Sequence, residues 1–203
     1  TSNSFEYHCP EHNKKSAKYS RNKGPLCLDL SLLAFILDDK ESAESYINIA
    51  SNYSLNSDLL SNTLKIIFDS TGNLEKAVSV CEKVILKNPN DIDLRKLKAS
   101  YLVQNQNFDA AIIEYASILD INPNDEDSKY SIYNLLSQKG ADEKEIIKQI
   151  YKTDKPNYEI VYSEFADMLL NREDFDAAEH YADILVNSFP NNAKGYILLS
   201  EIY

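Results

Sequence analysis

Two of the three histidines and two of the three cysteines lie near the N-terminus, where their types would suit a metal ion. His8, Cys9 and His12 fall close together, and Cys27 follows later in the chain. Imidazole nitrogens and thiolates are the ligands of tetrahedral zinc sites, which require a rigid backbone to hold them. Pro10 interrupts this stretch and Cys27 stands alone, so the sequence favours no metal site and no cofactor.

The same cysteines leave two other interpretations open. A Cys9–Cys27 disulfide would pin the N-terminal segment to the helix that follows it, and would require an oxidising compartment. The favoured interpretation is two reduced thiols with Cys27 buried, since three cysteines are too few for a disulfide scaffold. Cys81 lies at helical spacing from Ala77 and Val84, which predicts a small residue in the core.

No pattern of residues indicates catalysis. His180 is surrounded on its predicted helix by Asp176, Glu179 and Asp183, an arrangement typical of a solvated acidic face. The chain has only four glycines and none cluster, so a glycine-rich phosphate loop is excluded. The sequence therefore predicts that the chain is not an enzyme and has no catalytic residues.

The composition of the chain excludes some classes of binding partner. The 203 residues are 43% hydrophobic and 26% charged with a net charge of −11, and so acidic a chain is a poor candidate for binding nucleic acid. It holds no apolar run of about 18 residues, so we expect no direct membrane insertion. It begins with Thr1 rather than Met, which suggests a removed leader or a fragment. The compartment stays unknown; the cytoplasm is favoured, and the cell envelope or periplasm is the alternative if a leader or anchor was removed.

An internal repeat organises the chain. Three similar segments each contain an Ala that is followed twelve residues later by Pro, namely Ala77 with Pro89, Ala111 with Pro123, and Ala178 with Pro190. The first two pairs are 34 residues apart and the last two are 67 apart, which leaves room for one degenerate unit between them. Ala43 lies 34 residues before Ala77 and marks an earlier unit.

Each unit has the pattern of a helix, a turn and a second helix. In residues 92–125, Leu94, Leu97 and Tyr101 share one helical face, and Phe108 with Ala111 begins a second one. A polar break separates the two, and Pro123 ends the second helix because proline disfavours a helical residue before it. The small Ala lets the paired helix approach closely.

This pattern resembles the tetratricopeptide repeat, whose period is 34 residues. The resemblance implies an all-α fold, a right-handed α-solenoid of about five and a half helix–turn–helix units after an irregular N-terminal arm at residues 1–23. We expect the units at 24–57, 58–91, 92–125, 126–158, 159–192 and, in part, 193–203. The aromatic residue expected early in the first helix is present at Tyr162 and Tyr196, but Ser61 and Arg95 replace it elsewhere. The unit at residues 126–158 differs most from the family pattern, since Glu145 replaces the small Ala.

The segment 26–37 is apolar on nearly every side, so we expect more than one of its faces to be covered. Leu28, Leu32 and Phe35 would face the inner surface of the solenoid and form an apolar contact surface. The basic arm covers them in the favoured interpretation, and a partner peptide or a second subunit covers them in the alternative. Self-association through this helix, or through the end at 196–203, stays open.

Family resemblance also suggests a function. Such repeats are protein-interaction scaffolds whose ligands lie along the concave face built by the first helices, so we expect a protein or peptide partner. Asn and Ser can satisfy the backbone of an extended segment, and Tyr adds rigid contact area, although solvated polar positions would look the same. The groove residues expected on this basis are Asn62, Ile66, Lys96, Ser100, Tyr130, Asn134, Ser163 and Asp167.

A second hypothesis gives the chain a role inside a larger protein. It would be the substrate-recognition or regulatory module of an enzyme such as a glycosyltransferase, with the catalytic residues encoded beyond Tyr203. The incomplete sixth unit leaves both hypotheses open, because the parent reading frame would either close with a polar cap or continue into a catalytic domain.

Overall fold

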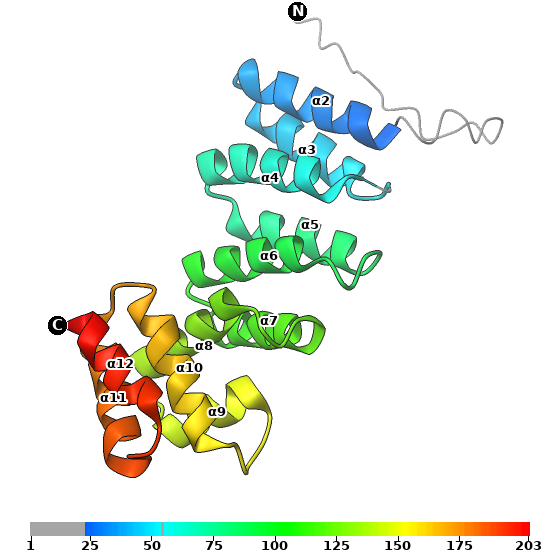
Figure 1. Ribbon diagram of the computed structural model, residues 1–203. Helices are drawn as coiled ribbons and strands as arrows, with labels where there is room; N and C mark the ends of the chain where they lie inside the picture. The colour runs from blue at the N-terminus through cyan, green and yellow to red at the C-terminus, as the bar shows by residue number, and fades with distance from the viewer. Residues whose placement is uncertain (1–22, 54) are drawn as a thin grey trace, which may run out of the picture. The chain divides into compact units, whose positions relative to one another are not determined.

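The computed structural model describes residues 23–53 and 55–203, and within them it consists of α-helices without strands (Figure 1). The predicted all-α fold of stacked helix–turn–helix repeats is confirmed. Two helices lie in each predicted full repeat, and α12 lies in the partial one. The helices are α2 (Lys23–Ile36), α3 (Lys40–Ala50), α4 (Ser57–Thr71), α5 (Leu74–Ile85), α6 (Ile92–Gln104), α7 (Phe108–Ile121), α8 (Glu126–Gln138), α9 (Glu143–Tyr151), α10 (Tyr158–Leu170), α11 (Phe175–Ser188) and α12 (Ala193–Ile202).

Asparagine and aspartate side chains begin most of these helices. Asn56, for example, accepts a hydrogen bond from the backbone N–H of Leu59, and Asp91 accepts one from that of Leu94. Each such cap satisfies a donor that the helix leaves unpaired and is worth about 1 kcal/mol. Gly72 ends α4 with a φ of 70°, a left-handed conformation that glycine adopts without steric cost. The many Asn and Asp residues of the sequence thus set the helix boundaries.

The chain divides into two compact units, residues 1–114 and 115–203. In the first unit α4 contacts both α2 and α6, whereas α3 contacts α5, so first and second helices form separate layers (Figure 1). Ala43, Ala77 and Ala111 have no exposed surface, which confirms that the repeated alanines allow close helix packing. Phe68 and Tyr101 are the largest fully buried side chains of this unit.

The second unit is built around an aromatic cluster. Phe165 of α10 is fully buried, and its ring lies 5.8 Å from that of Tyr133, 5.2 Å from that of Tyr181 and 6.1 Å from that of Tyr151. Helix α10 contacts α8, α11 and α12, and so places Phe165 at the centre of the unit. Edge-to-face pairs of this kind add to the stabilisation that burial alone provides.

The degenerate repeat keeps its helices although it lacks the small Ala. Glu145 lies on the exposed side of α9, and its backbone N–H is capped by the Asp142 side chain. Ile146, Ile147 and Ile150 form the buried face of α9 instead. The short α9 therefore packs through branched side chains where the other repeats use alanine.

The expected apolar contact surface of α2 needs a correction. Leu28 has no exposed surface and belongs to the core of the first unit, so it is not available to a partner. Leu32 is half-buried, and Phe35 packs partly against the same core. The helix turns these residues towards α3 and α4, and its exposed apolar side chains are Leu26, Leu33 and Ile36, with Leu37 just beyond its end.

In residues 23–53 and 55–203, no helix is long and apolar enough to cross a bilayer.

Candidate functional site

A cleft of about 650 Å³ lies between α4 and α6 in the first unit. Asn62, Lys96 and Ser100, three of the residues predicted for the groove, line it together. Ile66 is exposed one helical turn after Asn62 and lies just outside the cleft. The complete lining is Asp58, Ser61, Asn62 and Lys65 from α4 and Asp93, Lys96, Leu97 and Ser100 from α6.

The two helices pack in register because a hydrogen bond joins their first turns. Asp91 caps α6 and also accepts a hydrogen bond from the Ser57 hydroxyl at the start of α4. These two residues are 34 positions apart, which is one full repeat. Equivalent turns of the two helices therefore lie side by side, and Asn62 occupies in α4 the position that Lys96, 34 residues later, occupies in α6.

The chemistry of the cleft is mixed and polar. The charges in the cleft balance, because it holds two carboxylates and two ammonium groups. The carboxylates belong to Asp58 and Asp93, and the ammonium groups to Lys65 and Lys96. Ser61 is buried, and its hydroxyl has no hydrogen-bond partner in the described part of the chain. The sequence places this serine where the repeat usually carries an aromatic ring. A cleft of this composition offers donors and acceptors for a polar chain but few apolar contacts.

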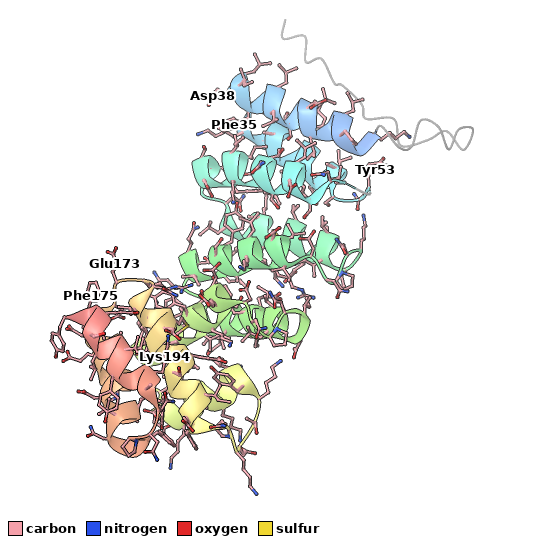
Figure 2. All side chains as sticks on the ribbon, in the orientation of Figure 1. Phe35, Asp38, Tyr53, Glu173, Phe175 and Lys194 are labelled. Carbon is pink, nitrogen blue, oxygen red and sulfur yellow. The ribbon has the colours of Figure 1, made fainter. Side chains whose placement is uncertain are left out.

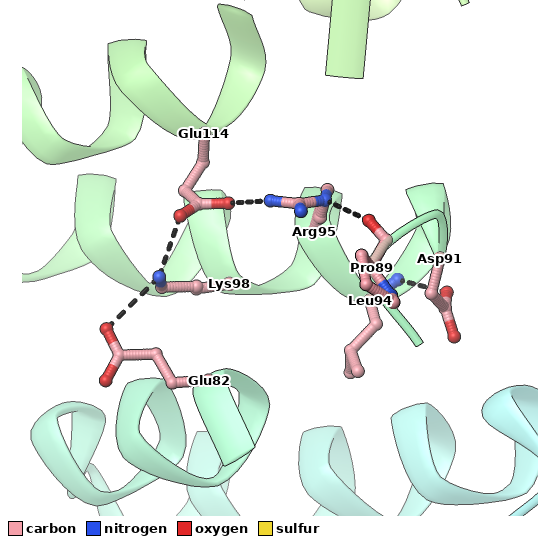
Figure 3. A network of polar contacts seen from close by, with 7 residues as sticks. All are labelled: Glu82, Pro89, Asp91, Leu94, Arg95, Lys98 and Glu114. Atoms are coloured by element: carbon pink, nitrogen blue, oxygen red, sulfur yellow. Dashed lines mark hydrogen bonds and ion pairs between the residues drawn. The ribbon is translucent and has the colours of Figure 1, made fainter. Parts of the chain in front are cut away.

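The opposite side of α6 is held by a network of ion pairs (Figure 3). The Glu114 carboxylate accepts hydrogen bonds from Arg95 at 2.9 Å and from Lys98 at 2.7 Å, and Lys98 also pairs with Glu82 at 3.1 Å. Arg95 donates in addition to the Pro89 carbonyl oxygen at 2.8 Å. Because these bonds join α5, α6 and α7, they fix the helix that supplies half of the cleft.

The charge of Lys98 follows from this setting. Burial lowers its pKa, but hydrogen bonds to Glu114 and Glu82 outweigh burial and raise the pKa above its usual value. The ammonium group therefore stays protonated throughout the physiological range. Sequence reasoning missed this network, because Glu114 lies 16 and 19 residues from its partners and no helical spacing connects them.

The other four predicted residues lie in the second unit and do not share one cleft. Tyr130 is on α8 with the Arg172 guanidinium 4.5 Å above its ring, and Asn134 lies half-buried one turn further along. Asp167 lines a cleft of about 200 Å³ beside α8 and is paired with Lys194 of α12 at 2.7 Å; Figure 2 labels this lysine. Ser163 lines a separate cleft of about 400 Å³ between α10 and Asn192, the residue that caps α12.

A partly buried ion pair lies beside these clefts. Glu164 accepts a hydrogen bond from Lys129 and another from the Tyr151 hydroxyl, both at 2.7 Å. Burial alone would raise the pKa of the Glu164 carboxyl, but the bonds from Lys129 and Tyr151 prevail and lower it below its usual 4.5. The stability that this carboxylate contributes is therefore complete above pH 4.5 and is lost as the pH falls through its lower folded-state pKa.

Replacing Glu164 by Gln should lower the stability at pH 7 by about 1 kcal/mol, since the Glu164 side chain is 43% exposed and the interaction is partly screened by solvent. It should also make the fall in melting temperature between pH 5 and pH 3 shallower than in the wild type. Thermal melts across this range test both effects. The matched control is Glu201→Gln, which neutralises an exposed carboxylate on α12; equal pH profiles for the two variants would contradict the assignment.

The structure also places some of the cysteines and histidines that the sequence singled out. Cys81 is fully buried, as predicted, and burial raises the pKa of its thiol to about 12. His180 lies exposed on α11 with its ring edge against Tyr181. The ranges that the structure describes hold no group of three or more His, Cys, Asp or Glu side chains suited to a metal ion. Cys27 is fully buried, as the favoured interpretation predicts. His8, Cys9 and His12 lie outside those ranges, so the choice between two reduced thiols and a Cys9–Cys27 disulfide stays open.

The comparison with family models agrees with the repeat pattern over part of the chain. Residues 70–132 match the family described as tetratricopeptide repeat. No curated protein matches the chain. Among solved structures, a tetratricopeptide repeat protein from Parabacteroides merdae is 18% identical over 92% of this chain and 73% of its own, with a TM-score of 0.47. YrrB, described as a TPR protein with an unusual peptide-binding site, is 13% identical over 91% of this chain and 94% of its own, with a TM-score of 0.45.

Proposed function

We propose that this chain is a tetratricopeptide repeat protein and that it acts as a non-catalytic scaffold, holding an extended peptide segment of a partner protein in the cleft between α4 and α6. The family is generally a protein-interaction fold. The observation that carries the proposal is that Asn62, Lys96 and Ser100, from two successive repeats, line a single cleft.

Hydrogen-bond chemistry explains why a peptide would suit this cleft. An extended peptide has backbone N–H and C=O groups that no secondary structure satisfies. The Asn62 amide can donate and accept, and the Ser100 hydroxyl, which donates to the Leu97 carbonyl at 2.7 Å, still has its oxygen as an acceptor. The balanced charges of the cleft favour a peptide with both acidic and basic side chains over a uniformly acidic one.

The proposal is tested with a library of random peptides displayed on phage, screened against the 203-residue chain. A selected peptide should bind the triple variant Asn62→Ala, Lys96→Glu, Ser100→Ala at least about tenfold more weakly than the wild type, as measured by isothermal titration calorimetry. All three side chains lie at the surface of the cleft, so the melting temperature should change little.

Lys144→Glu is the matched control for the charge change. Lys144 is exposed on α9 in the second unit, so this variant changes the net charge as Lys96→Glu does but leaves the cleft intact. It should bind the peptide as the wild type does. Equal affinities of the triple variant and the wild type would show that the peptide does not bind in this cleft.

We further propose a second contact region in the second unit, formed by Tyr130, Asn134, Ser163 and Asp167. The corresponding test is the double variant Tyr130→Ala with Asn134→Ala.

A further inference from the structure

Four leucines form one stripe along α2 and the residue after it. Leu26, Leu33 and Leu37 are 54%, 52% and 71% exposed, and Leu30 between them is half-buried. Leu37 continues the helical pattern, since its N–H donates to the Leu33 carbonyl at 3.0 Å. At 3.6 residues per turn the stripe lies on the side of the helix opposite Leu28. Four apolar side chains in a row on one exposed face exceed the scattered apolar residues of an ordinary surface.

The spacing of these leucines is the same when read from either end. The intervals from Leu26 to Leu37 are four, three and four residues, and all four positions carry the same side chain. A two-fold axis requires that residue i of one copy meet residue j of the other, and that j meet i in turn. Two antiparallel stripes satisfy this condition, because Leu26 then lies against Leu37 of the second copy and Leu30 lies against Leu33.

The charges at the ends of the stripe fit the same arrangement. Lys23 begins α2, and Asp38 is exposed just after the helix ends, next to the labelled Phe35 in Figure 2. An antiparallel copy would bring each Lys23 close to the Asp38 of the other chain. Opposite charges at both ends favour the antiparallel arrangement, whereas a parallel pair would place like charges together.

We propose that this protein forms a homodimer in which α2 packs against α2 of a second copy across a two-fold axis. The contact is independent of the cleft between α4 and α6, whose side chains it does not use. A single pair of helices buries less than a standard protein interface, so we expect a weak dimer with a dissociation constant in the micromolar range.

Sedimentation velocity of the 203-residue chain over a wide range of concentrations tests the proposal. The wild type should shift from monomer to dimer as its concentration rises. Leu33→Lys should weaken the dimer at least about tenfold, because the two-fold axis introduces the charge twice. Leu86→Lys is the matched control: Leu86 is 82% exposed at the end of α5, away from the stripe, and its variant should dimerise as the wild type does.

Disulfide trapping tests the antiparallel register. In a Cys9→Ser background, a mixture of the L26C and L37C variants should form a cross-linked dimer on oxidation. L26C alone should not, because residues 26 of the two copies would lie about 16 Å apart along the helix axis. A monomer at every concentration, or a dimer that Leu33→Lys leaves intact, would overturn the proposal. Trapping of L26C alone in preference to the mixture would overturn the antiparallel pairing.

Discussion

Replacing Glu114 by Ala should lower the free energy of unfolding by about 3 kcal/mol. Glu114 is the common partner of Arg95 and Lys98, and all three side chains are largely buried. Its removal leaves two positive charges with little access to water and without their shared carboxylate. The loss should be nearly independent of salt concentration, since ions screen buried pairs poorly. Urea denaturation followed by circular dichroism measures it.

Glu82→Ala is the control for this prediction. Glu82 also pairs with Lys98 (Figure 3), but its side chain is 54% exposed. Exposed ion pairs contribute between about 0 and 1 kcal/mol, so this variant should stay close to the wild type. Glu114→Gln, which keeps an oxygen acceptor at the same place, should fall between the two. If Glu114→Ala lowered the free energy of unfolding no more than Glu82→Ala does, the prediction that Glu114 stabilises the protein through this network would be wrong.

The second large effect is expected for Phe165→Ala, which should destabilise the protein by about 4 kcal/mol. The ring is fully buried and touches three tyrosine rings, so its removal leaves a cavity that the rigid neighbours cannot fill. The near-ultraviolet circular dichroism of the tyrosines should weaken as well, because the rings lose their fixed packing. Thermal melts and near-ultraviolet spectra measure the two effects.

Phe175→Ala provides the comparison, because it removes the same side chain from a half-exposed position at the start of α11 (Figure 2). We expect it to cost about 1 kcal/mol. Phe165→Leu, which fills most of the volume, should cost less than Phe165→Ala. Similar losses for Phe165→Ala and Phe175→Ala would argue against the central position of the aromatic cluster in the second unit.

The repeat could be predicted from the sequence because its signals are local. The alanine of most second helices, the proline after it and the Asn or Asp before most helices act within a few residues, and Ala77 and Ala111 are buried as expected. Their spacing then shows which helices are equivalent. Three residues of the predicted groove meet in one cleft for the same reason, since equivalent positions of successive repeats are neighbours in space.

What the sequence did not show depends on pairs that are distant in sequence and irregular in spacing. The partner of Arg95 is a glutamate on another helix, and the ring of Tyr130 is covered by Arg172 from the turn after α10. Leu28 and Leu33 of α2 are both leucine, and only the position of the neighbouring helices decides which of them is buried. Hydrophobic periodicity says little in a helix that is apolar on nearly every side.

The length of the polar links has a consequence for folding. Ser57 bonds to Asp91 34 residues later, Lys83 to Asn48 35 residues earlier, and Lys129 to Glu164 35 residues later. Each of these bonds joins a repeat to the next one along the chain. Each of them therefore closes a loop of about one repeat, which is entropically less costly than closing a longer one. We expect a repeat emerging from the ribosome to be able to dock on the one before it without waiting for a distant segment of the chain.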